Sequence, residues 1–145
     1  MRKEVVLLTV EDDDGHFWLI RRNLQREGIP NKIVRFADGQ EVLDYLFRLG
    51  DGEQREGHTA YLMLLDIRMP KVNGIEVLRQ IKDDENLRKI PIVMLTTTDD
   101  QAEIDKSHKL GCSLYIVKPI EYADFVDTVR KLARFLAIVE IPEIV

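Results

Sequence analysis

The chain of 145 residues is long enough to bury one hydrophobic core and too short to suggest a second domain. Hydrophobic residues make up 45% of the chain and charged residues 32%, a balance typical of a folded globular domain and not of a disordered segment. The formal net charge of -5 argues against nonspecific nucleic-acid binding, which needs clustered lysine and arginine. We therefore expect no nucleic-acid partner.

The cysteine content and the first residues bear on location. Cys112 is the single cysteine, so no internal disulfide can form, and we interpret it as a small core residue. Residues 1–10 contain too short an apolar run for a signal peptide or a membrane span. We therefore expect a cytoplasmic protein with no membrane partner.

Apolar runs and helical stripes alternate along the chain. Residues 4–10, 32–36, 61–65, 92–95 and 114–117 are typical of β-strands, and three of these runs contain almost no polar residue. Between these runs, apolar residues recur at helical spacing and predict three helices. The first is marked by Phe17, Ile20 and Leu24, the second by Val42, Leu43, Leu46 and Phe47, and the third by Ile75, Leu78 and Ile81. A fourth helix is predicted from Thr98, with Gln101 as its capping-box partner, to about Gly111, and a fifth from about Tyr122.

The alternation predicts a doubly wound α/β domain, with a five-stranded parallel sheet and right-handed crossovers. In such domains, ligands bind beyond the carboxyl ends of the strands. The residues that follow each strand are therefore the candidates for a functional site.

Those positions carry a distinctive set of side chains. Glu11 and Asp12 follow the first strand and Asp66 follows the third, so three carboxylates should converge at one sheet edge. Such a group either raises a pKa or recruits a cation, and oxygen ligands suit Mg²⁺ better than zinc. Lys118 after the fifth strand and Thr96 at the end of the fourth could contact further oxygens of a phosphoryl group. The pattern predicts a site that accepts a phosphoryl group on Asp66.

Simpler interpretations exist for each feature taken alone. The "EDDD" run at residues 11–14 is more often a solvated loop in which Asp14 caps a helix, and Lys-Pro or Thr-Thr after a strand is often ordinary loop chemistry. Their joint placement at one sheet edge favours the site. His16, His58 and His108 show no metal-ligand spacing and are assigned to surface or core packing.

Four segments together resemble the receiver domain of two-component response regulators: "VED" at 10–12, "LLDIRMPKVNG" at 64–74, "VMLTT" at 93–97 and "YIVKP" at 115–119. The resemblance implies a flavodoxin-like sheet of order 2-1-3-4-5. It further implies that Asp66 is the phosphoacceptor, with Glu11, Asp12 and the backbone carbonyl of Arg68 as Mg²⁺ ligands. Thr96 and Tyr115 would be the switch pair and Lys118 the lysine typical of the family. By analogy the peptide bond between Lys118 and Pro119 could be cis, an isomer that the sequence leaves open.

Within that family the chain is similar to the stand-alone receivers associated with phytochromes, through "EVLDYLFR", the insert at 49–60, "LTTTDD" and the tail. This resemblance implies a sensor histidine kinase as partner, with a phytochrome kinase as the candidate, and signalling through protein contacts without an attached output domain. Residues 1–137 would form the receiver domain. Residues 138–145 form an apolar tail, and we predict that this tail exchanges between two copies in a homodimer; the alternative is that it folds back on its own domain.

Three alternative functions remain. A Mg²⁺-dependent phosphatase or phosphomutase also phosphorylates an Asp after a strand, but its usual second Asp is replaced here by Arg68. A nucleotide-binding module lacks its glycine-rich loop in this sequence. A receiver-like scaffold would not need Asp66, Thr96 and Lys118 together.

Overall fold

The computed structural model describes residues 1–145 and contains the predicted alternation of strands and helices. The strands are β1 (Val6–Val10), β2 (Ile33–Phe36), β3 (Thr59–Leu65), β4 (Ile92–Thr96), β5 (Leu114–Val117) and a short β6 (Glu143–Ile144). The helices are α1 (Asp14–Arg26), α2 (Gly39–Phe47), α3 (Gly74–Asp83), α4 (Gln101–Leu110) and α5 (Tyr122–Leu136), with a 3₁₀ turn, η1, at Leu87–Lys89. The parallel order β2-β1-β3-β4-β5 confirms the doubly wound prediction.

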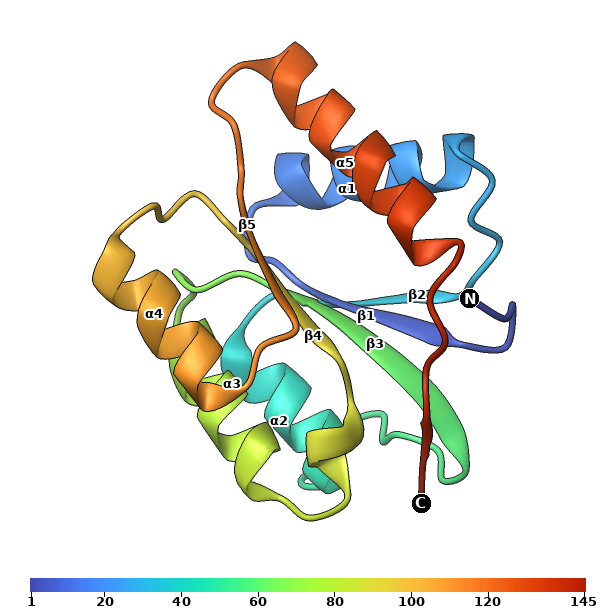
Figure 1. The fold of residues 1–145 in the computed structure, drawn as a ribbon. Helices are drawn as coiled ribbons and strands as arrows, with labels where there is room; N and C mark the ends of the chain where they lie inside the picture. The colour runs from blue at the N-terminus through green and yellow to red at the C-terminus, as the bar shows by residue number, and fades with distance from the viewer.

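The sheet separates two apolar cores. Figure 1 shows α1 and α5 over one face and α2, α3 and α4 over the other. Because successive strand residues point to opposite faces, Leu7 enters the core beneath α1 and α5, and Leu8 enters the core beneath α2 and α3. Burial on both faces explains why these strands are almost free of polar residues. No helix combines the length and hydrophobicity that a bilayer-spanning segment requires.

The start of α4 differs from the prediction. The helix begins at Gln101 and not at Thr98, because the Asp100 carboxylate accepts a hydrogen bond from the backbone N–H of Ala102 and caps the helix. Thr98 is engaged elsewhere: its hydroxyl accepts from Arg68 Nε at 3.2 Å, and its carbonyl accepts from Tyr115 at 2.7 Å. A threonine tied to two other elements cannot serve as the helix cap.

The tail lies along its own domain in this structure. Glu143 and Ile144 pair in antiparallel fashion with Ala60 and Thr59, and the Ile144 side chain is 1% exposed in the core of α2 and α3. Asn86 holds the last residue by two hydrogen bonds, one to its N–H at 2.9 Å and one to its carbonyl at 2.8 Å. In this single chain the tail therefore folds back on its own domain. The residues that pair with β6, Thr59 and Ala60, belong to β3, which thus begins two residues inside the segment that the sequence suggested was an insert.

Candidate functional site

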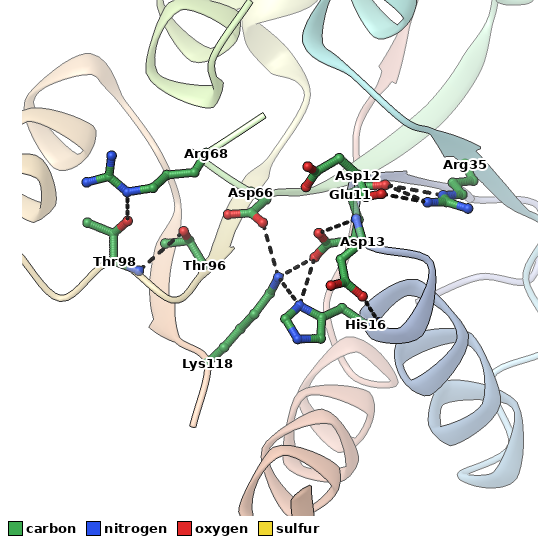
Figure 2. A network of polar contacts seen from close by, with 10 residues as sticks. All are labelled: Glu11, Asp12, Asp13, His16, Arg35, Asp66, Arg68, Thr96, Thr98 and Lys118. Atoms are coloured by element: carbon green, nitrogen blue, oxygen red, sulfur yellow. Dashed lines mark hydrogen bonds and ion pairs between the residues drawn. The ribbon is translucent and has the colours of Figure 1, made fainter. Parts of the chain in front are cut away.

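The predicted site residues meet at the carboxyl edge of the sheet (Figure 2). Glu11 and Asp12 directly follow β1, and Asp66 directly follows the neighbouring strand β3. The last paired residues of the two strands are Val10 and Leu65, so Glu11 and Asp66 leave the sheet side by side. One carboxylate oxygen from each of the three lies within 4.8 Å of the others. The convergence inferred from strand ends is therefore present in the structure.

Lys118 reaches this cluster from the loop after β5. Its backbone N–H is anchored to the carbonyl of Thr96 at 2.7 Å, which fixes where the side chain starts. Its ammonium contacts Glu11 Oε1, Asp66 Oδ2 at 3.2 Å and His16 Nδ1 at 3.2 Å. The side chain is almost fully buried, so the ion pairs stand in a medium that screens them poorly. The peptide bond between Lys118 and Pro119, whose isomer the sequence left open, is trans, as are all the others.

Asp66 has one oxygen free for chemistry. Lys118 contacts Oδ2, whereas Oδ1 is buried without any hydrogen-bond partner. A buried carboxylate oxygen without a partner is unfavourable, so Oδ1 is suited to receive a ligand. The three carboxylates, including the unpartnered Oδ1 of Asp66, offer only oxygen ligands, which fit a hard divalent cation such as Mg²⁺. This set lacks the nitrogen and sulfur donors of zinc sites.

Glu11 is the most strongly perturbed acid of the cluster. Burial raises its pKa to about 7, against the opposing effect of Lys118, and the nearby charge of Asp66 raises it further. The cause is that two carboxylates share one ammonium in a dry site. A proton would therefore compete with a cation for Glu11 near neutral pH.

The predicted switch residues lie beside the acids without contacting them directly. Thr96 is fully buried, and its hydroxyl accepts a hydrogen bond from the backbone N–H of Thr98 at 3.4 Å. Tyr115 is partly buried, its hydroxyl donates to the Thr98 carbonyl, and burial raises its pKa to about 12. Thr98 thus links the two, a role that the sequence did not indicate.

Arg68 forms one wall of the site. Its side chain points away from Asp66 toward Thr98, as Figure 2 shows, and its Nη2 atom lies 3.6 Å from Glu103 Oε2 on α4. Arg68 and Asp12 both line an open pocket of about 490 Å³ at the sheet edge. The pocket opens to solvent beside Asp12, the exposed member of the three carboxylates.

Two residues at the site were missed from the sequence. His16 was assigned to packing, but its ring contacts Lys118. Arg35 on β2 donates to the backbone carbonyls of Glu11 at 3.1 Å and Asp12 at 3.4 Å, and so fixes the acidic loop. The sequence does place His16, alone among the three histidines, near the acidic loop. No local signal marks Arg35, which reaches the loop from a different strand.

Comparison with known proteins gives a consistent result. Residues 7–130 match the model of the response regulator receiver domain. The receiver domain from Rhodospirillum rubrum is 39% identical, with a TM-score of 0.90 over 96% of this chain and 98% of that one. The phosphorylated cyanobacterial phytochrome response regulator RcpA is 30% identical, with a TM-score of 0.84 over 98% and 100% of the two chains. The Mn²⁺-bound response regulator Rcp1 is 28% identical, with a TM-score of 0.83 over 94% and 98%.

Proposed function

This chain belongs to the family of response regulator receiver domains, and on that premise we propose that Asp66 accepts a phosphoryl group from a partner histidine kinase. The observation that carries the proposal is the environment of Asp66, which has one oxygen on Lys118 and one buried oxygen without a partner. No other acid of the cluster combines these two features. Asp66 is therefore the nucleophile that the site favours.

The proposed reaction is an in-line displacement at phosphorus. An oxygen of Asp66 forms the new bond, the bond from phosphorus to the kinase histidine nitrogen breaks, and that nitrogen keeps the electron pair. Lys118 neutralises charge on the phosphoryl oxygens, and catalysis is mainly positioning and charge stabilisation. A Mg²⁺ ion held by Glu11, Asp12, Asp66 and the carbonyl of Arg68 would supply further charge neutralisation. The Mn²⁺-bound Rcp1 supports this choice of cation type.

Phosphorylation would act through charge and hydrogen bonding. An acyl phosphate replaces the carboxylate with about -1.5 to -2 of charge and several acceptor oxygens. The Thr96 hydroxyl, now bonded only to the N–H of Thr98, would turn to one of these oxygens. Movement of Thr96 would disturb Thr98, which accepts hydrogen bonds from both Tyr115 and Arg68. The signal would therefore leave through α4, β5 and α5.

We propose a signalling role and not a turnover enzyme, because Arg68 stands where phosphatases place their second acid. The structural likeness to RcpA supports a phytochrome as the upstream partner. A homodimer formed through the tail is also proposed. The support for it is that Ile144 and its two-residue strand occupy a site that the same segment of another copy could fill equally well.

The test is phosphotransfer from a panel of purified histidine kinases that includes phytochrome kinases. We expect one or more to transfer acid-labile phosphate to the wild-type chain and none to Asp66→Asn. Asp13→Asn is the matched control, since Asp13 is an exposed acid whose capping role asparagine can keep. Labelling of Asp66→Asn at the wild-type level would overturn the proposal.

A further inference from the structure

The ammonium of Lys118 has three N–H donors, and the structure supplies three acceptors. Two are the carboxylates of Glu11 and Asp66, and the third is Nδ1 of His16 at 3.2 Å. Lys118 is only 3% exposed, so water does not provide alternatives. Each donor is therefore committed, and His16 is the one uncharged partner.

The contact between His16 and Lys118 depends on the tautomer of the ring. An ammonium can only donate, so the contact is a hydrogen bond when Nδ1 carries no proton and Nε2 carries the ring hydrogen. The same Nδ1 atom lies 3.9 Å from Glu11 Oε1, which is beyond hydrogen-bond distance. Nitrogen NMR reads the tautomer directly.

Neighbouring elements hold the ring independently of Lys118. The backbone N–H of His16 donates to the capping Asp13 at 2.9 Å in the first turn of α1. The ring lies on Phe125 of α5, with the centroids 5.3 Å apart and the planes inclined at 32°. Phe125 is buried in the core beneath these helices. The ring of His16 therefore has a packing contact on α5 that does not involve Lys118.

The other two acceptors are committed to other chemistry. Glu11 and Asp66 belong to the carboxylate cluster suited to a cation, and Asp66 gains a phosphoryl group in the proposed reaction. When these carboxylates are engaged, their attraction for Lys118 changes. His16, in contrast, gains no phosphoryl group in the proposed reaction and is not one of the three clustered carboxylates.

We propose that His16 is a positioning residue for Lys118, whose neutral Nδ1 holds the ammonium where it meets the transferring phosphoryl group. This inference rests on the proposed function of Asp66. The geometry is the basis: a ring packed on α5, a fully committed ammonium, and one acceptor outside the carboxylate cluster.

Two substitutions separate hydrogen bonding from packing. His16→Phe keeps a ring against Phe125 but removes the acceptor. His16→Asn loses the ring packing but can place Oδ1 near the position of Nδ1. If Nδ1 positions Lys118, the maximal rate of phosphorylation by acetyl phosphate at saturating Mg²⁺ falls roughly tenfold in His16→Phe, the order expected for a lost hydrogen bond to a charged group. His16→Asn then retains most of the rate, although it is the less stable variant.

Two further readouts exclude a general structural effect. Mg²⁺ affinity, measured by calorimetry, should stay within about twofold of wild type in both variants, because His16 is not a member of the carboxylate cluster. In a Lys118→Met background, His16→Phe should cause no further loss of rate. Nitrogen-15 NMR of the wild-type ring should show the Nε2–H tautomer without any phosphodonor present.

The outcomes are distinguishable. A wild-type chain that no donor phosphorylates refutes the function proposed for Asp66 and leaves the tautomer measurement standing. A phosphorylated wild type with an equally fast His16→Phe, a larger loss in His16→Asn than in His16→Phe, or an Nδ1–H tautomer would overturn the role of His16.

Discussion

Replacement of Gly74 by alanine tests how the fold supports the phosphoacceptor. Gly74 opens α3 directly beneath Asp66, and its N–H donates to the carbonyl of Ile67 at 2.8 Å. A Cβ atom there would lie 2.1 Å from the backbone oxygen of Asp66 and 2.8 Å from the Cα atom of Ile67. Ordinary contacts begin at about 3.4 Å, so α3 and the Asp66 loop must separate by more than an ångström.

The magnitude follows from two opposing effects. Forced backbone shifts in a packed region cost roughly 1–3 kcal/mol, at the upper end here because the clash is with backbone. The helix preference of alanine over glycine returns at most ~1 kcal/mol. We expect Gly74→Ala to lower the free energy of unfolding by about 2 kcal/mol. With a urea m-value of about 2 kcal/mol/M, the midpoint would fall by ~1 M.

Urea denaturation followed by circular dichroism gives the stability, and phosphorylation by acetyl phosphate gives the effect on the site. Gly52→Ala is the matched control, because a Cβ at Gly52 meets nothing within 4 Å. Its unfolding free energy should change by less than ~0.5 kcal/mol. If Gly74→Ala were as stable as the control and phosphorylated at the wild-type rate, the reasoning about the packing beneath Asp66 would be refuted.

Three other predictions concern the metal ligands and the tail. Asp12→Ala should weaken Mg²⁺ binding far more than Asp13→Ala in calorimetry, and equal affinities would make the acidic run a solvated loop. Burial raises the pKa of Glu11 from 4.5 to about 7, so Mg²⁺ affinity should rise as the pH rises toward 7 and the carboxylate loses its proton. The stability of the metal-free protein should fall as the pH rises from about 4.5 to about 7, because the unfolded chain releases this proton first. An affinity that does not change with pH would contradict this prediction. Deletion of residues 138–145 should weaken the proposed homodimer, which light scattering measures. Because the deletion also removes the buried Ile144, it should lower the free energy of unfolding by ~2–4 kcal/mol, which the urea midpoint measures. A dimer of unchanged affinity and a chain of unchanged stability would refute this prediction.

The sequence predicted the sheet and the convergence of the acids and the lysine at its edge for a clear physical reason. Strands buried on both faces must be almost wholly apolar, so their ends are visible as the first charged residues. In a parallel sheet those ends share an edge. Glu11, Asp66 and Lys118 could therefore be brought together from spacing alone, and the structure confirms that they meet.

Interactions between distant segments could not be predicted in this way. The start of α4 depends on the contacts of Thr98 with Arg68 and Tyr115, which lie 30 and 17 residues away. The two residues of β6 are too few for a periodic signal, and their pairing partner was hidden in a polar stretch. The contact between His16 and Lys118 joins residues that lie 102 positions apart in the chain, so it could not be read from local spacing.

The central claim is that phosphate is carried by Asp66. The full chain would be treated with Mg²⁺ and a small phosphodonor and then reduced with borohydride, which converts an aspartyl phosphate to homoserine. Peptide mass spectrometry then locates the modified residue. We expect homoserine at position 66 and at no other acid, and we expect its formation to depend on Mg²⁺. An unmodified Asp66 beside a converted Asp12 or Asp13, or no conversion with any donor, would contradict it.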